Sequence, residues 1–303
     1  HLPRTKTFAQ IITELDSLYA MGWRKNIFFV DDNFIGNKKY IKTEVLPALI
    51  AWRKGKTGMP FSTEVSINLA DDPVLLNLMV QAGFDTVFVG IETPNVDSLA
   101  ECNKNQNKDR DLVESVKHLQ HAGLQVQGGF IVGFDSDSLS IFQQQIDFIQ
   151  KSGIVTAMVG LLQAPLGTRL YDRMEKEGRL VNEFSGDNVD GSTNIIPKMG
   201  MEPLQDGYRK ILSQIYAPDL YYERVFTFLR EYHPPKNRAQ FELQHFLAFW
   251  RSIYQLGIRG DERIQYWQLF FWTLFRRPTL FPLAITLAIY GFHFRQVATL
   301  HVI

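Results

Sequence analysis

Short apolar runs alternate with amphipathic helical patterns along the first two-thirds of the chain. The runs cover residues 27–30, 61–69, 87–89, 126–133 and 155–163. Runs of this length and composition are typical of strands, and uninterrupted ones suit strands buried on both faces. Four of the five runs follow a helical pattern that closes on a glycine, at Gly22, Gly83, Gly123 and Gly153. The pattern therefore predicts repeated strand–helix units, a parallel sheet and an α/β fold.

The first helical pattern, residues 7–21, precedes every predicted strand. A (β/α) barrel normally opens with a strand, so we expect a barrel or open sheet whose first strand and following loop are missing from this chain. Further helices are predicted over residues 39–53, from Asp71-Asp72-Pro73 onward, over 109–121, up to about residue 152, and over 168–178. Ser136 or Asp137 is the expected N-cap of the helix that ends near residue 152.

Polar residues and glycines stand where the predicted strands leave the sheet. In parallel α/β folds this edge, at the carboxyl ends of the strands, is where ligands bind. Within the run 61–69, polar side chains at 64, 66 and 68 alternate with apolar ones, so they are expected to share one face. The candidate binding residues at this edge are Asp31, Asp32, Asn33, Glu64, Ser66, Glu92, Thr93, Gly129, Gly133 and Gln163.

The chain changes character near residue 200. After a turn-rich polar stretch, the remainder is helical in pattern and rich in aromatic residues. We predict a domain boundary there, with a (β/α) domain over residues 1–200 and an all-α domain over residues 201–303. Aromatic residues at helical spacing favour a packed core, although Arg276-Arg277-Pro278 and the apolar residues after it leave contact with a membrane surface open.

Composition narrows the function classes. The 303 residues carry a formal net charge of zero, so no overall field favours nucleic acid. The single cysteine, Cys102, excludes an internal disulfide framework and a multi-cysteine metal site within this chain, and no metal ligand set is predicted. No signal peptide is recognised, and the apolar stretch 280–292 is shorter than the ~20 residues of a spanning helix. A cytoplasmic protein is expected.

Four segments, in this order and spacing, resemble the radical SAM enzymes. They are residues 29–34 (Phe-Val-Asp-Asp-Asn-Phe), 69–73 (Leu-Ala-Asp-Asp-Pro), 89–94 (Val-Gly-Ile-Glu-Thr-Pro) and 129–134 (Gly-Phe-Ile-Val-Gly-Phe). The resemblance is to the branch that carries an N-terminal cobalamin-binding domain. The part after residue 200 resembles a helical domain of unknown function that ends some members of that branch.

The resemblance implies an incomplete (β/α)6 barrel that binds S-adenosylmethionine beside a [4Fe-4S] cluster. Its reaction would be cobalamin-dependent methyl transfer or a radical rearrangement of a small-molecule substrate. The N-terminal cobalamin-binding domain of the same protein would be this chain's partner.

Family positions can be assigned residue by residue. Asp31, Asp32 and Asn33 match the end of the second strand, which usually bears Gly-Gly-Glu and meets the methionine amino group. Glu64 and Ser66 match a third-strand position where many relatives carry Gln-x-Arg. Glu92 and Thr93 match the fourth-strand position that faces the ribose, and Gly129, Gly133 and Gln163 match positions beside the adenine.

The cluster motif is the main departure. Relatives hold three irons with a Cys-x3-Cys-x2-Cys loop after the first strand, whereas Cys102 stands alone after the fourth. One thiolate cannot hold such a cluster. We therefore expect this chain to be a fragment of the enzyme that is inactive alone.

Two other functions remain open from the residues. The chain could be a (β/α)-barrel lyase or hydrolase that uses Asp31, Asp32 and Glu92 as acid–base groups or metal ligands. It could also be a module without a cluster that only binds a nucleotide or a partner.

Overall fold

The computed structural model describes residues 5–181, 185–186, 190–234 and 243–301. Its centre is a parallel sheet of five strands, in the order β1 (Ile27–Phe29), β2 (Phe61–Glu64), β3 (Phe84–Glu92), β4 (Gln125–Val132) and β5 (Ala157–Leu161). The α/β class and all five predicted strands are confirmed. Strands that are consecutive in sequence lie next to one another, as is usual in sheets built from repeated strand–helix units.

Helices precede the first strand, connect each strand to the next and follow the last strand. They are α1 (Phe8–Ala20), α2 (Lys38–Tyr40) continuing through a π-helix, η1 (Ile41–Val45), into α3 (Leu46–Arg53), α4 (Pro73–Ala82), α5 (Val96–Glu101), α6 (Leu112–Ala122), α7 (Ile141–Ser152) and α8 (Arg169–Lys176). The predicted helix-ending glycines Gly83, Gly123 and Gly153 adopt left-handed φ values of 101°, 108° and 70°. Asp72 and Thr168 cap α4 and α8 as their positions predicted.

The second predicted strand is shorter than the sequence indicated. β2 ends at Glu64, and a 3-10 helix, η2 (Ile67–Asp71), follows where the alternation 61–69 predicted strand. Ser66 and Asn68 therefore do not continue a ladder; instead the Ser66 hydroxyl donates to Asn68 Oδ1 at 2.8 Å. The prediction was wrong because Ile67 and Leu69 are buried equally well on the inner side of a helical turn.

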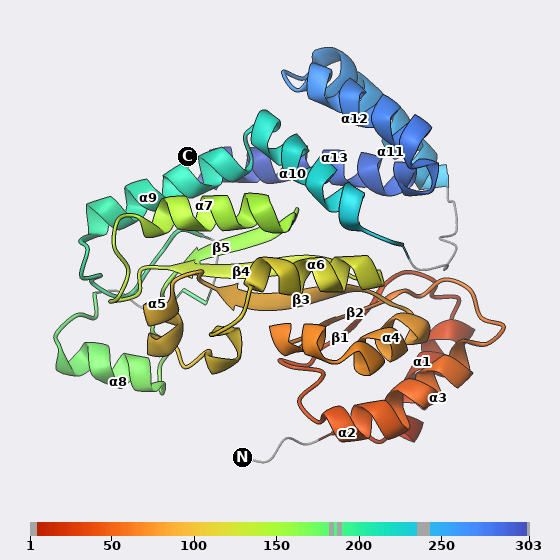
Figure 1. Cartoon of the computed structure of the whole chain (residues 1–303), viewed down its shortest axis with the longest axis horizontal. Coiled ribbons are helices and arrows are strands. Elements are labelled where there is room, and N and C mark those ends of the chain that lie inside the picture. The colour runs from red at the N-terminus through yellow and green to blue at the C-terminus, as the bar shows by residue number, and fades with distance from the viewer. Residues whose placement is uncertain (1–4, 182–184, 187–189, 235–242, 302–303) are drawn as a thin grey trace.

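The two faces of the sheet differ. Val87, Val89 and Ile91 of β3 are buried on the face against which α4 and α6 pack (Figure 1). Residues of the opposite parity point to the other face, where Phe28 of β1 and Met158 of β5 keep 47% and 43% of their surface exposed. We call this second face the open face of the sheet.

The chain after residue 200 is helical throughout its described part. Its elements are α9 (Met201–Ile215), α10 (Pro218–Glu231), α11 (Leu243–Ser252), the π-helix η4 (Ile253–Arg259), α12 (Arg263–Arg276), the 3-10 turn η5 (Pro278–Leu280) and α13 (Phe281–His301). The hydroxyls of Tyr208 in α9 and of Tyr216, which directly follows α9, donate to the Val159 and Ala157 carbonyls of β5. One hydrophobic core spans residue 200. A separate all-α domain, a boundary near residue 200 and barrel closure therefore stay predictions.

No helix within the described ranges combines the length and the hydropathy that crossing a membrane requires.

Candidate functional site

The ends of β1 and β2 form one continuous edge. Asn33, in the loop after β1, accepts a hydrogen bond at Oδ1 from the Ser66 backbone N–H at 3.1 Å. One residue further, the Phe34 N–H donates to the Glu64 carbonyl at 2.9 Å. These bonds hold the loop that carries Asp31, Asp32 and Asn33 against the residues that follow β2. The prediction that the carboxyl ends of these parallel strands share one edge is confirmed for this pair.

Glu92 and Lys104 form an ion pair at the end of β3. Lys104 Nζ lies 2.7 Å from Glu92 Oε1, and 15% of the Glu92 side chain is exposed. Lys104 comes from the loop between α5 and the 3-10 turn η3 (Asn105–Asn107). A β-carbon added to Gly90 would meet Glu92 Oε1 at 2.6 Å and Lys104 Nζ at 3.0 Å, so the pair lies directly over Gly90. Because Gly90 points to the open face, so does the Glu92 carboxylate.

The backbone of Glu92 is held in an unfavourable conformation. Its φ is 65°, a left-handed value that costs a non-glycine residue about 1–2 kcal/mol. The pairing of β3 with β4 shifts register between Gly90 and Glu92, as in a β-bulge that redirects a side chain. Gln145 of α7 donates to the Glu92 carbonyl at 3.3 Å, and Asn107 donates to the Gly90 and Ile91 carbonyls at 3.2 and 3.0 Å. Both buried amides stabilise the bulge.

Glu64 brings a second carboxylate to the same place. Burial raises its pKa above the ordinary value, the negative charge of Asp32 raises it further, and Lys104 lowers it in part. Glu64 therefore lies near both Asp32 and Lys104, and Lys104 pairs with Glu92, so carboxylates from the ends of three adjacent strands form one group. The group can accept hydrogen bonds from hydroxyl or ammonium donors.

Gly129 and Gly133 are placed differently from each other. A β-carbon on Gly129 would meet Cζ of Phe88 at 2.7 Å, so the Phe88 ring covers the space that the family resemblance assigns to an adenine. Gly133 has a left-handed φ of 107° and is buried. Its N–H and that of Phe134 donate to Asp137 Oδ2 at 2.9 and 3.0 Å. Asp137 therefore organises this turn, and the predicted cap of α7 was wrong, since Ser140 occupies that position.

Three further predicted residues make other contacts. Thr93 is fully buried, and its hydroxyl accepts from the Asn95 N–H at 3.2 Å. Gln163 donates to the Ser192 carbonyl at 3.3 Å, in the segment that follows α8. Asp31 is exposed and its N–H donates to the Phe29 carbonyl. The cofactor-binding role of each of these residues stays a prediction.

Known proteins resemble both halves of the chain. A family model of a domain of unknown function, DUF4070, matches residues 168–302. An uncharacterised methyltransferase of Synechocystis sp. is 37% identical over 300 residues, which are 97% of this chain and 56% of that protein. A hopanoid C-2 methylase of Rhodopseudomonas palustris is 34% identical over 276 residues, or 88% of this chain and 51% of that protein.

The fold has a solved counterpart. The radical S-adenosylmethionine methyltransferase TsrM of Kitasatospora setae, whose structure contains cobalamin and a [4Fe-4S] cluster, superposes with a TM-score of 0.51. The match covers 95% of this chain and 56% of TsrM at 13% sequence identity. The likeness shows that this chain shares the fold of that radical SAM methyltransferase. The chain spans about half the length of the curated relatives that it matches.

The described residues of this chain do not fit an iron–sulfur cluster. Cys102 is half-buried, its thiol donates to the Leu99 carbonyl at 3.6 Å, and burial raises the pKa of the thiol. Among the described residues, no group of three or more His, Cys, Asp or Glu side chains could hold a metal ion. No chemical step is therefore assigned to a cluster on these residues.

Sequence reasoning missed two residues that shape the site. Gln145 lies within a helical pattern and reads as a surface position, yet it is fully buried. Asp137 reads as a helix cap. For both residues, the signal in the sequence was a polar amide or carboxylate on the apolar side of its segment. Such a group is expected to hold nearby backbone, because buried polar groups are almost always hydrogen-bonded.

Proposed function

We propose that this chain supplies the S-adenosylmethionine-binding edge of a methyltransferase of the radical SAM family. The observation that carries the proposal is the strained, doubly supported Glu92, whose carboxylate lies over Gly90 on the open face. A carboxylate held in this way accepts hydrogen bonds from vicinal hydroxyls such as those of a ribose. Glu64, Asp32 and Asn33 beside it suit an ammonium group. The two relatives named above are called a methyltransferase and a methylase, which supports methyl transfer as the reaction.

The open face fits a role as one half of a larger site. Phe28 and Met158 expose apolar surface on the side to which Glu92 points. We assign this side to the small-molecule substrate and to an N-terminal cobalamin-binding domain of the same protein. The cluster ligands would come from residues outside this chain, which would be inactive alone. A cytoplasmic location stays a prediction.

Equilibrium dialysis with radiolabelled S-adenosylmethionine tests the proposal, on this chain and on a longer protein that contains it. Replacing Glu92 by Gln should weaken binding about tenfold or more, because a hydrogen bond to a charged acceptor contributes roughly 1.5–3 kcal/mol. Glu114→Gln is the matched control, since Glu114 is exposed on α6 and pairs with Lys117. Equal affinity of Glu92→Gln and the unmodified protein would contradict the proposal. Mg²⁺ binding that disappears in Glu92→Gln would instead favour a lyase or hydrolase.

A further inference from the structure

The helices α11 and α12 expose an unusual number of large apolar side chains. Phe246, Trp250, Tyr254 and Ile258 recur at every fourth position along α11 and η4, next to Leu247, and α12 adds Ile264, Phe271, Leu274 and Phe275. Each keeps between 39% (Leu274) and 76% (Phe275) of its surface exposed. We call these nine side chains the hairpin face. α11 and α12 lie far from α5 and α8, toward which the strand ends point (Figure 1).

The opposite side of the hairpin is fully packed, so the exposure is specific to one face. Tyr266, Leu269 and Thr273 of α12 are buried against the molecule. The Tyr266 hydroxyl is 2.9 Å from Ser252 Oγ, which joins α12 to α11. A helix that buries one apolar side and exposes another is expected to have a second contact surface.

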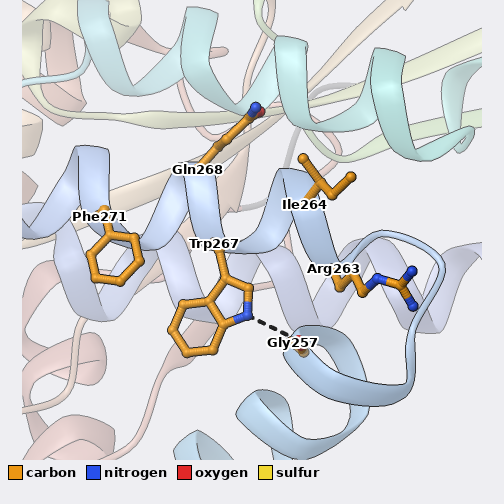
Figure 2. Close-up of a pocket in the computed structure, with 6 residues that line it drawn as sticks. All are labelled: Gly257, Arg263, Ile264, Trp267, Gln268 and Phe271. Carbon is orange, nitrogen blue, oxygen red and sulfur yellow. Dashed lines mark hydrogen bonds between the residues drawn. The ribbon is translucent and has the colours of Figure 1, made fainter.

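A hollow between η4 and α12 interrupts the hairpin face. It is a shallow, open hollow of about 490 Å³, lined by Gly257, Arg263, Ile264, Trp267, Gln268 and Phe271. Figure 2 shows the Trp267 indole and the Phe271 ring side by side along α12, with Trp267 Nε1 donating to the Gly257 carbonyl at 2.9 Å. The floor of the hollow is therefore aromatic, and Arg263 stands at its end.

The charges around the hairpin face are mostly positive. Between residues 246 and 276 the sequence contains four arginines, at 251, 259, 263 and 276, no lysine, and two acids. All four arginines are exposed. Of the acids, Asp261 is exposed, whereas Glu262 is buried and paired with Arg295. Because the whole chain has a formal net charge of zero, this local excess is a property of the hairpin.

We propose that the hairpin face docks on the surface of an anionic lipid bilayer. Trp, Tyr, Phe and aliphatic side chains enter the boundary between headgroups and acyl chains, and arginines beside them bind lipid phosphates. The exposed apolar side chains of the hairpin face match the acyl-chain side of that boundary, and the exposed arginines match its phosphates. A second copy of the chain fits less well, because a two-fold interface places a patch on itself and would bring the same arginines together. The inference does not rest on the proposed methyl transfer.

Flotation with vesicles tests the proposal, using this chain and vesicles of phosphatidylcholine with or without phosphatidylglycerol. The chain should float with the anionic vesicles, and added salt should weaken the binding. The double variant Trp250→Ser, Phe275→Ser should bind about tenfold more weakly, because two large apolar groups no longer leave water. Arg276→Gln should bind anionic vesicles about fivefold more weakly, from roughly 1 kcal/mol per cation near such a surface.

Matched controls separate docking from general stickiness. Val74→Ser on α4 and Arg169→Gln on α8 change exposed residues outside the hairpin face and should bind as the unmodified chain does. Circular dichroism should show that every variant is folded. The proposal is overturned if the chain does not float with anionic vesicles, or if the hairpin variants float as well as the controls. Light scattering that shows a dimer lost in the hairpin variants, without vesicle binding, would assign the face to a second copy.

Discussion

Gln145 Nε2 lies 3.3 Å from the backbone carbonyl of Glu92, and the same amide donates to the Ile131 carbonyl at 2.8 Å. One helical side chain therefore connects the ends of β3 and β4. The contact matters because the Glu92 backbone is strained, and a left-handed residue persists only where its surroundings support it. The Gln145 side chain is fully buried, so water does not compete for these bonds.

Replacing Gln145 by Leu should lower both stability and ligand binding. The change leaves buried carbonyls without their donor, at a cost of about 1–3 kcal/mol each, so the free energy of unfolding should fall by roughly that amount or more. Urea unfolding measures the loss, and S-adenosylmethionine dialysis should show weaker binding because Glu92 is no longer held. Gln144→Leu is the control, since Gln144 is exposed on the same helix. Stability equal to that control would mean that the bulge does not depend on Gln145.

Glu92→Gly should be more stable than Glu92→Gln. Both variants lose the ion pair with Lys104, but only glycine adopts a φ of 65° without steric cost. We expect a difference of about 1 kcal/mol in the free energy of unfolding, measured by urea denaturation. Both variants should bind S-adenosylmethionine poorly. A less stable glycine variant would show that the left-handed backbone is not a source of strain.

The strand–helix alternation was sufficient to predict the sheet, because buried parallel strands and glycine helix ends leave strong local signals. The strand ends were predicted for the same reason, and Asn33, Glu64 and Glu92 do lie at them. The details depend on contacts between distant residues. Nothing near Glu92 in sequence reveals Gln145, which is 53 positions away, and nothing near Gly129 reveals that the Phe88 ring covers it. The exposure of Trp250 and Phe275 was missed because helical spacing does not say which face of a helix is packed.

Two glycines on neighbouring strands should respond differently to alanine. A β-carbon on Gly90 would press on Glu92 Oε1 and Lys104 Nζ, the ends of flexible side chains, so Gly90→Ala should weaken ligand binding with little loss of stability. On Gly128 the β-carbon would meet the Phe130 ring at 2.7 Å and Ile154 at 3.1 Å in the core. Gly128→Ala should therefore lower the free energy of unfolding by about 1–3 kcal/mol. Thermal unfolding and dialysis on both variants check the contrast, which equal stability losses would contradict.

Glu64 should make stability depend on pH in a defined direction. Its folded pKa is raised, first by burial and then by the charge of Asp32, so the folded state binds this proton more tightly than the unfolded state does. Stability from this group is therefore greatest below the ordinary glutamate value and decreases as the pH rises through the folded pKa. Glu64→Gln removes the effect.

Urea unfolding at pH 4, pH 5.5 and pH 7 would measure it. The free energy of unfolding of Glu64→Gln, relative to that of the unmodified chain, should rise with pH across this range. Glu44→Gln, at an exposed position of η1, is the matched control for the loss of a glutamate carboxylate. Asp32→Asn should reduce the dependence, since it removes one of the two causes of the shift. A relative stability of Glu64→Gln that falls with pH would contradict this prediction. It would mean that Lys104 dominates the environment of Glu64 and keeps its carboxylate ionised at the carboxyl end of β2.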